Sequence, residues 1–402
     1  MKILLLTNEY PHPSDSNADR TGVVGEFARE WVKQGHEVVV IVNSSAFPSF
    51  FYAVGNRIRP VVSKTFDVSQ TPDTLWIKRF QYDDQGVYVE NLPMTKIIPH
   101  GKFSARVKHR QIRKIIALLD QLNFSPDVVT GHWVNPQVLL IPALAEHYGA
   151  KSAFVFHADY IRKTCEKFGV QKYLDRIDHV GFRSGSAAQA AKEYLHLKEE
   201  PFLAASGIPD AFTEKFGSPP PRNYDSALSI ITAARLVEYK KIDAIIDAAA
   251  LAFPDQQFAL TVAGSGPLLP DLQDRAAHAG IQKKVTFVGK IPRESLQERM
   301  RESDVFVLIS RRETFGLVYL EAMLHGCIVI ASRFGGVDGI IQDGVNGFLC
   351  EEGNAEALAD ILKRIRNMPP QEKSRVSRSA YDTAVRFTAG DVARRYLDQI
   401  TR

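Results

Sequence analysis

Cysteines and long apolar runs are both scarce in this sequence. The three cysteines, Cys165, Cys327 and Cys350, form no C-x-x-C pair, so a disulfide framework or a cysteine-ligated zinc site has no support. No stretch approaches the roughly 18 apolar residues that a membrane-spanning helix needs. The run Ile3–Leu6 is too short for the core of a signal peptide and predicts a buried strand instead. We therefore expect a cytoplasmic protein, free or peripheral at the inner face of the membrane.

Several motifs of common enzyme classes are missing as well. The chain contains no Asp-x-Asp, no phosphate-binding P-loop and no Ser-His-Asp nucleophile elbow. Without Asp-x-Asp, a metal-chelated diphosphate site has no support, and we expect neither a metal nor a cofactor. The stretch Gly264-Ser265-Gly266 lacks the third glycine of a dinucleotide fingerprint, because Leu269 stands in its place. This argues against an NAD-dependent oxidoreductase.

Acidic residues are absent from Asn91 to Leu119, and the net charge of +4 comes from the first half of the chain. The same segment carries seven cations: Lys96, Lys102, Arg106, Lys108, Arg110, Arg113 and Lys114. An aromatic run, Phe47 to Tyr52, precedes it. A basic amphipathic helix beside an aromatic loop suits an anionic membrane surface. A solvated helix over an acceptor pocket explains the pattern equally well, whereas nothing else supports nucleic-acid binding.

What the sequence does contain is an alternation of short apolar runs with helix-period segments. Such a pattern predicts parallel sheets covered on both faces, here two doubly wound α/β domains that face a cleft. Punctuation by glycine and proline in Ser206–Ser226 indicates the boundary, giving an N-terminal domain over 1–205 and a second over 206–379. The second half predicts strands at Leu228–Ala233, Phe258–Ala263, Val285–Val288, Val305–Ile309, Ile328–Ala331 and Gly347–Cys350. Ligands of such sheets bind beyond the carboxyl ends of the strands.

The richest motif follows one of these strands and opens a helix. It runs from Glu313 through Phe315, Gly316 and Leu317 to Glu321. A glycine lets a ligand approach the backbone, and free amides at a helix start bind hydroxyl or phosphate oxygens. Carboxylates suit sugars because each accepts two hydroxyl hydrogen bonds. Taken alone, the two glutamates are more readily interpreted as solvated surface groups.

The motif resembles that of the large family-4 (group 1) glycosyltransferases, an E-x-F-G-L-x-x-x-E-A core followed by a small-residue turn and a strand. The resemblance implies that Glu313 and the amides of Phe315, Gly316 and Leu317 hold the donor sugar, while Glu321 binds the nucleotide ribose. It also implies the GT-B fold, and that a final segment, 380–402, packs back on the N-terminal domain.

Further matches to the family follow other predicted strands. Arg235 and Lys240 fall on its diphosphate-binding cations, although Lys241 replaces the usual glycine. Gly264 begins a stretch that is similar to the family's nucleotide loop, and Ile291 lies in the segment that contacts the base.

In the first half, Thr21-Gly22 stands where the family has two glycines, and Gly22 is expected to place a helix start against phosphate. His157, at the end of a predicted strand, matches the family's histidine near the donor sugar. His132 is similar but weaker, and Asp159 is placed to orient His157 or to cap the next segment. A lone histidine is more often structural.

Together these residues predict a metal-independent glycosyltransferase whose donor is a nucleotide-diphosphate sugar and whose acceptor is a lipid-linked or cell-surface glycan. The resemblance implies retention of anomeric configuration, and donor frequency within the family favours UDP over GDP. The alternative from another class is a non-catalytic protein that binds nucleotide sugars or acts as a scaffold on an inherited fold.

Overall fold

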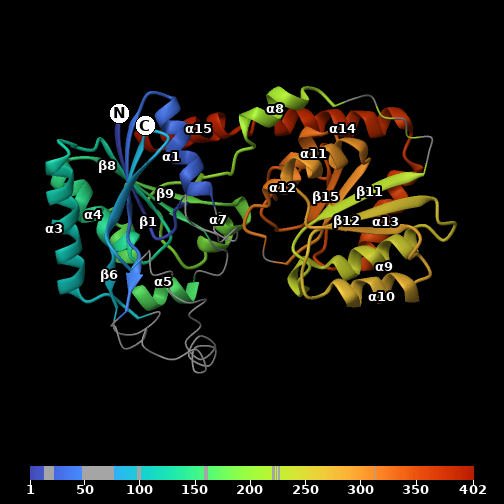
Figure 1. Ribbon diagram of the computed structural model, residues 1–402, viewed down its shortest axis with the longest axis horizontal. Coiled ribbons are helices and arrows are strands. Elements are labelled where there is room, and N and C mark those ends of the chain that lie inside the picture. The colour runs from blue at the N-terminus through green and yellow to red at the C-terminus, as the bar shows by residue number, and fades with distance from the viewer. Residues whose placement is uncertain are drawn as a thin grey trace. The chain divides into compact units, whose positions relative to one another are not determined.

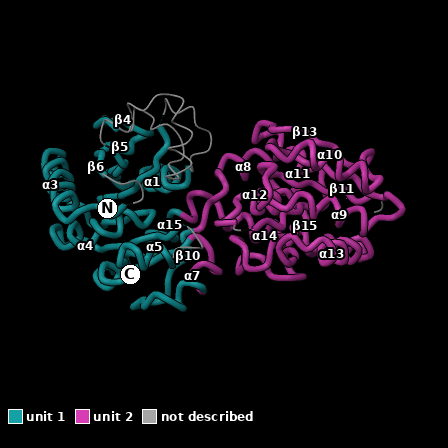
Figure 2. The backbone as a smooth tube through the Cα atoms, turned by 90° about the horizontal axis from the view of Figure 1, so that it is seen from below, with its two compact units in different colours: residues 1–182, 190–204, 393–402 teal, residues 183–189, 205–392 magenta. Residues whose placement is uncertain are grey.

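The structure is a computed structural model, and it describes residues 1–12, 22–47, 77–96, 101–157, 162–219, 222, 224, 227–311 and 313–402. The chain forms two compact units (Figure 2). Unit 1 comprises Met1–Phe182, Ala190–Ala204 and Ala393–Arg402, and unit 2 comprises Arg183–Gln189 and Ala205–Val392. The sequence predicts boundaries at 205/206 and 379/380. The structure differs in giving residues 183–189, 205 and 380–392 to unit 2, so that the chain rejoins unit 1 at Ala393.

The central sheet of unit 1 has the strand order β10-β9-β8-β7-β1-β2-β5-β4 within the described residues. Neighbouring strands are parallel, except that β4 is antiparallel to β5. The strands are β1 (Lys2–Thr7), β2 (Glu37–Val42), β4 (Phe80–Asp84), β5 (Val87–Asn91), β7 (Val128–His132), β8 (Lys151–Phe156), β9 (His179–Phe182) and β10 (Phe202–Leu203). A separate short pair joins β3 (Ser45–Ala46) and β6 (Met94–Thr95).

Helices cover this sheet. They are α1 (Val23–Lys33), α3 (Ala105–Gln121), α4 (Gln137–Tyr148), α5 (Arg162–Phe168), α6 (Gln171–Leu174), the last residues of α7 (Gly185–Ala191), whose earlier residues belong to unit 2, and the end of α15 (Ala389–Thr401). The buried face of α1 carries Phe27 and Trp31 at i, i+4 spacing. Trp31 Nε1 donates to the carbonyl of Ala393 at 3.0 Å, and the Tyr396 ring meets Trp31 edge-on at 5.3 Å between centroids. These contacts fix the end of α15 in unit 1.

The sheet of unit 2 is wholly parallel, in the order β13-β12-β11-β14-β15-β16. Its strands are β11 (Leu228–Ala233), β12 (Phe258–Ala263), β13 (Val285–Gly289), β14 (Val305–Leu308), β15 (Ile328–Ser332) and β16 (Phe348–Cys350). Its helices are α8 (Asp210–Phe216), the 3₁₀ turn η2 (Glu238–Lys240), α9 (Ile242–Ala252), α10 (Leu269–His278), α11 (Arg293–Glu302), α12 (Leu317–Leu324), α13 (Ala355–Asn367) and α14 (Pro370–Ala384).

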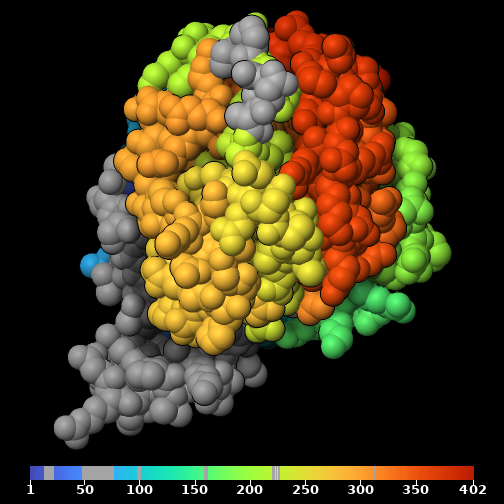
Figure 3. All heavy atoms as spheres, turned by 90° about the vertical axis from the view of Figure 1, so that its right-hand side faces the viewer, coloured from blue at the N-terminus to red at the C-terminus, as the bar shows by residue number. Residues whose placement is uncertain are grey.

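Helices lie on both faces of this second sheet, as its near-continuous apolar strands require. Figure 1 shows α9, α10 and α13 on one face and α11, α12 and α14 on the other. In Figure 3, which views the end of unit 2, the yellow α9 lies beside the red α13. The chain runs outward from β11 to β13 and then crosses back to β14 on the other side of β11. The reversal between β11 and β14 is a topological switch point, where doubly wound sheets bind ligands.

Candidate functional site

The loop after β14 carries the long motif, and its geometry depends on Gly316. This residue caps α12 with a left-handed φ of +77°. A Cβ at this position would lie 2.4 Å from the ring of Tyr319, which is buried and donates its hydroxyl to the carbonyl of Leu308 at 2.8 Å. Glycine is therefore required by both the backbone and the packing. The helix that follows begins at Leu317, and helix geometry leaves its first amides without intrahelical partners.

Glu313 is paired with Lys240, which lies in η2 after β11. Their side chains form an ion pair through Glu313 Oε2, and Ser310 Oγ donates to the same oxygen at 3.2 Å. The backbone amide of Arg311 donates to the carbonyl of Tyr239 at 2.7 Å. Two loops that follow neighbouring strands are thus tied together by a backbone bond and an ion pair, and both charged side chains are about 15% exposed.

Arg235 lies between β11 and Lys240 in the sequence. Unlike Lys240, it is not shielded from water. Its side chain is exposed, and the described residues offer it no ion pair. The cation next in line, Lys241, takes a left-handed backbone with φ 54° and ψ 38°. The turn therefore has the conformation that suits the family's glycine, although lysine occupies it.

A third loop, after β12, packs directly on the loop after β11. A Cβ on Gly264 would lie 1.8 Å from the carbonyl oxygen of Ala234, and one on Gly266 would lie 2.3 Å from that of Leu236. Both glycines are required by this contact between the chain's own backbones. The loops that carry Gly264, Arg235 and Glu313 are therefore neighbours at one edge of the sheet.

Phe315 is buried in the same region. Gly336 packs on it so closely that a Cβ there would lie 2.4 Å from Phe315 Cα. On another side, the guanidinium of Arg183 lies 5.4 Å from the centre of the Phe315 ring. Sequence reasoning missed Arg183, since nothing in its local pattern connects it with a motif 132 residues away.

Glu321 lies on α12 and is almost fully buried. Its carboxylate accepts hydrogen bonds from Arg293 and Gln297, both on α11, which follows the loop containing Ile291. Sequence reasoning also missed these two residues. Their i, i+4 spacing on a helix was the available signal, because it predicts that they share a face.

The two predicted histidines of unit 1 lie in contact with each other. His157 directly follows β8, and His132 ends the neighbouring β7. The two rings meet at 2.6 Å between His157 Nε2 and His132 Nδ1, and the Trp133 ring stacks on His157 at 4.0 Å. His132 Nε2 reaches the hydroxyl of Tyr396 at 3.3 Å. Asp159, which the sequence places near His157, lies outside the described residues.

Gly22 caps the start of α1 with an ordinary φ of −78°. A Cβ there would find Glu26 Oε1 at 3.9 Å, which is normal contact. The fold itself therefore does not require glycine at this position, unlike at Gly316. The adjoining Thr21 is outside the described part of the chain.

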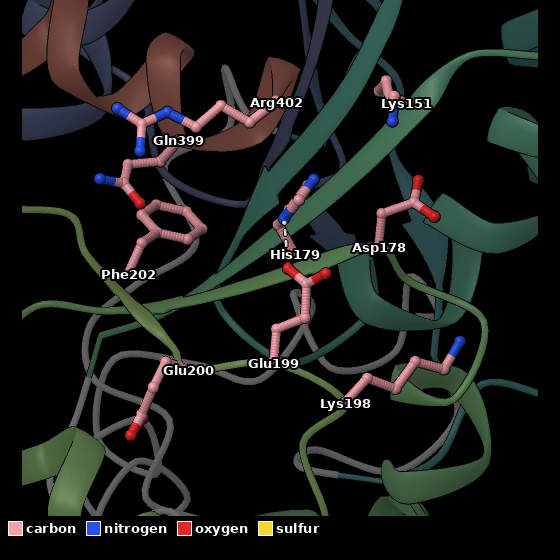
Figure 4. Close-up of a pocket in the computed structure, with 9 residues that line it drawn as sticks. All are labelled: Lys151, Asp178, His179, Lys198, Glu199, Glu200, Phe202, Gln399 and Arg402. Atoms are coloured by element: carbon pink, nitrogen blue, oxygen red, sulfur yellow. Dashed lines mark ion pairs between the residues drawn. The ribbon is translucent and has the colours of Figure 1, made fainter.

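A hollow of about 360 Å³ lies near the amino ends of β8, β9 and β10 in unit 1 (Figure 4). Its charges are mixed, and His179 Nδ1 contacts Glu199 Oε2 at 3.3 Å. The lining residues are Lys151, Asp178, His179, Lys198, Glu199, Glu200, Phe202, Gln399 and Arg402. None of them belongs to the predicted site.

Comparison with known proteins gives a consistent result. The family model described as glycosyl transferases group 1 matches residues 218–383. D-inositol 3-phosphate glycosyltransferase of Mycolicibacterium gilvum is 34% identical over 271 residues, covering 65% of this chain and 59% of the relative. Alpha-monoglucosyldiacylglycerol synthase of Streptococcus pneumoniae is 27% identical over 286 residues, covering 67% and 64%. The chain thus spans less than two thirds of the length of these two relatives.

The fold is shared more widely than the sequence. The crystal structure of Anabaena HepE in complex with UDP superimposes with a TM-score of 0.66 at 15% identity, covering 100% of both chains. The predicted GT-B fold is therefore confirmed. Within the described ranges, none of the helices combines the length and apolar character that crossing a bilayer demands. Residues 218–383 thus match the group 1 glycosyl transferases, and the chain as a whole is similar to curated members of that group.

Proposed function

We propose that the protein transfers a sugar from a nucleotide-diphosphate sugar to an acceptor, with retention of anomeric configuration and without a metal ion. The observation that carries the proposal is the pairing of Glu313 with Lys240 at the switch point, with Arg235 exposed beside them. Ligands of doubly wound sheets bind at such a reversal. The loops after β11 and β14 thus bring together a carboxylate suited to sugar hydroxyls and two cations suited to phosphate.

In this proposal each charged group has a distinct role. Arg235 and Lys240 stabilise the negative charge that develops on the departing diphosphate, which replaces the work of a metal ion. Glu313 accepts hydrogen bonds from the donor sugar, and Glu321 accepts those of the ribose. The free amides at the start of α12, from Phe315 to Leu317, add donors to the sugar.

The residues of unit 1 complete the prediction. The fold has room for a side chain at Gly22, so packing does not explain the glycine. We propose that glycine serves there to let the start of α1 approach the donor. His157 is proposed to contact the donor sugar, with its ring oriented by His132 and Trp133.

The reaction we propose is a front-side transfer. The carboxylate of Glu313 is engaged by Lys240 and Ser310, so we do not propose it as a nucleophile. The leaving phosphate therefore takes the acceptor proton while the new glycosidic bond forms on the face from which the phosphate departs. The proposed nucleotide is UDP rather than GDP, supported by the UDP complex of Anabaena HepE.

The proposed acceptor is a lipid-linked or cell-surface glycan, reached from the cytoplasmic side of a membrane. Helix α3 supports this, because its exposed side carries Arg106, Arg110, Arg113 and Lys114, while Ile115 is among its buried residues. The relative from Streptococcus pneumoniae is named for a diacylglycerol product. The aromatic run after Phe47 lies outside the described residues.

The basic surface extends beyond α3. Burial and the charge of Lys167 on α5 lower the pKa of Lys96 to about 8. Burial alone would raise the pKa of Tyr173, but its hydrogen bond to Lys108 and the nearby charges of Lys108 and Lys172 lower it overall. Lysines from separate segments are therefore crowded together, and such crowding is relieved by an anionic partner.

The alternative is a non-catalytic protein that binds nucleotide sugars. The proposal is tested by incubating the protein with UDP- and GDP-sugars, without added metal, and measuring release of nucleoside diphosphate. Release that depends on Glu313 supports transfer chemistry. Tight binding without release, with or without added acceptor lipid, supports the binding protein, and reduction of NAD in place of either would support an oxidoreductase.

A further inference from the structure

The carboxylate of Glu321 is held by two side chains from one helix. Arg293 donates to Oε1 through Nε at 3.0 Å and also through Nη2, while Gln297 Nε2 donates to Oε2 at 2.7 Å. Arg293 and Gln297 are one turn apart on α11, so they present their donors on the same face. Only 5% of the Glu321 side chain is exposed. Both oxygens are therefore fixed before any ligand arrives.

Gln297 is itself fixed from behind. It is fully buried, and its Oε1 receives a hydrogen bond from His325 Nε2 at 2.7 Å. A flipped amide would place its oxygen against the carboxylate of Glu321, so only one orientation satisfies both neighbours. Burial, with the charges of Arg301 and Arg222, lowers the pKa of His325 to about 4. The ring is therefore neutral near pH 7 and must carry its proton on Nε2.

The remaining hydrogen-bonding capacity of Glu321 is specific. Arg293 places two donors on Oε1, whereas Gln297 uses one of the two lone pairs of Oε2. Oε2 thus keeps one acceptor site. Arg293 is 42% exposed, and its guanidinium lies 4.9 Å from the centre of the Phe212 ring. Among the described residues, its further partner is therefore an aromatic face and not a second carboxylate.

We propose that Arg293 and Gln297 are positioning residues that set Glu321 to recognise the ribose of a nucleotide, with His325 fixing Gln297. The inference rests on the proposed function, because it assumes that Glu321 meets a nucleotide. Its physical basis is preorganisation: a carboxylate that is already oriented by its hydrogen bonds loses little freedom when a hydroxyl binds. The three residues act on the sugar of the nucleotide and not on its phosphates or base.

The test compares nucleotides that differ only in their hydroxyls. UDP and GDP are titrated calorimetrically into the full-length protein, and the one that binds is compared with its 2′-deoxy and 2′,3′-dideoxy forms. We expect the wild type to favour the ribose form roughly 10- to 100-fold, as for hydrogen bonds to a charged group. Arg293→Met and Gln297→Met should each bring that ratio close to one, while affinity for the dideoxy form changes less than about threefold.

Controls separate this role from a general effect on folding. Arg299→Ala removes an exposed cation from the same helix and should leave the ratio unchanged. Arg293→Lys keeps the charge but loses the two-donor geometry, so it should recover only part of the preference. If both methionine variants keep the wild-type ratio, the positioning role is overturned while nucleotide binding stands. If neither UDP nor GDP binds the wild type, the proposed function fails and this inference with it.

Discussion

Lys240 and Glu313 form an ion pair between two loops that are 73 residues apart in the sequence. One loop follows β11 and the other follows β14, the strands at which the order of the sheet reverses. Both side chains are largely shielded from water, at 16% and 15% exposure. The pair thus holds a cation and a carboxylate in fixed positions without a ligand, which is what preorganised electrostatic stabilisation requires.

The first prediction concerns Glu313. Glu313→Ala should lower the rate of donor turnover by at least about 100-fold. The donor sugar loses the carboxylate that accepts its hydrogen bonds, and Lys240 loses its fixed position. Turnover is measured as release of nucleoside diphosphate, and folding is followed by circular dichroism. A well-folded variant with near-normal turnover would remove Glu313 from the site.

A double-mutant cycle adds a structural control. Glu313→Gln and Lys240→Met should each lower the melting temperature, because each leaves the other partner without its opposite charge. The double variant should be more stable than the sum of the two losses predicts, since it removes both charges. Additive losses would mean that the two side chains do not interact in solution.

The second prediction concerns Arg235, the exposed cation of the same edge. Arg235→Ala should weaken transition-state stabilisation by roughly 2–4 kcal/mol, the range for losing one key electrostatic contact. Its melting temperature should not change, because no ion pair to it is found among the described residues. Lys240→Ala should lower both activity and stability. Activity that needs an added divalent metal and survives loss of both cations would contradict a metal-independent mechanism.

The third prediction uses the left-handed backbone of Lys241. A side chain at this φ destabilises the fold by roughly 1–2 kcal/mol, and glycine avoids this strain. Part of the gain is offset because glycine has more conformational freedom in the unfolded chain. Lys241→Gly should therefore raise the free energy of unfolding by up to about 1 kcal/mol. Lys241→Ala is the matched control, because it removes the charge but keeps the Cβ. Equal stability of the two variants, measured by urea unfolding, would show that the turn is not strained.

The fourth prediction concerns acid stability. The pKa of His325 is lowered to about 4, first by burial and then by Arg301 and Arg222. Below the ordinary pKa of about 6.5, His325 binds a proton in the unfolded state but stays neutral in the folded state. Stability is therefore fully present above about pH 6.5 and falls as the pH decreases toward 4, by up to about 3 kcal/mol.

His325→Asn keeps a donor near Gln297 but does not titrate in this range. Its unfolding free energy should fall less steeply than that of the wild type between pH 6.5 and 4. Both proteins are compared by urea unfolding at several pH values. Parallel curves for the two proteins would assign the acid sensitivity to other groups.

Much of unit 2 could be predicted from the sequence, because its buried strands are continuous apolar runs bounded by turns. The predicted bounds Leu228–Ala233 and Phe258–Ala263 are those of β11 and β12. At Gly316 the sequence predicted close approach of a ligand, whereas the structure adds a left-handed φ and tight packing against Tyr319. In unit 1, the sequence did not order the region 43–100, where β4 and β5 form an antiparallel pair. Polar residues alternate along β4, which lies at the sheet edge.

The partners of the site residues could not be predicted. The ion pair of Lys240 with Glu313 depends on which strands become neighbours, and local pattern does not encode this. The hold of Arg293 on Glu321 depends likewise on how α11 packs beside α12. The motif thus indicated the residues that we propose to meet a ligand, whereas only the tertiary structure revealed the side chains that contact them.

The last prediction tests the membrane surface. On α3, Arg106, Arg110 and Arg113 recur at i, i+4 and i+7, and Lys114 adjoins them, so the cations share the exposed side. Each cation held near an anionic leaflet contributes about 1 kcal/mol, and salt screens the attraction beyond roughly 8–10 Å. The protein should therefore sediment with vesicles that contain phosphatidylglycerol at low salt, and progressively less as salt is raised.

Changing Arg106, Lys108, Arg110 and Arg113 to Gln should abolish most of this binding. A control variant removes the same charge by changing Lys198, Lys283, Arg299 and Arg378 to Gln, all exposed and none on α3. It should bind as the wild type does, because its cations belong to separate segments and not to one helix face. Equal losses in the two variants would indicate a response to net charge alone. Binding that is absent at low salt, or that survives in the α3 variant, would reject membrane docking by this helix and favour an acceptor that diffuses freely in water.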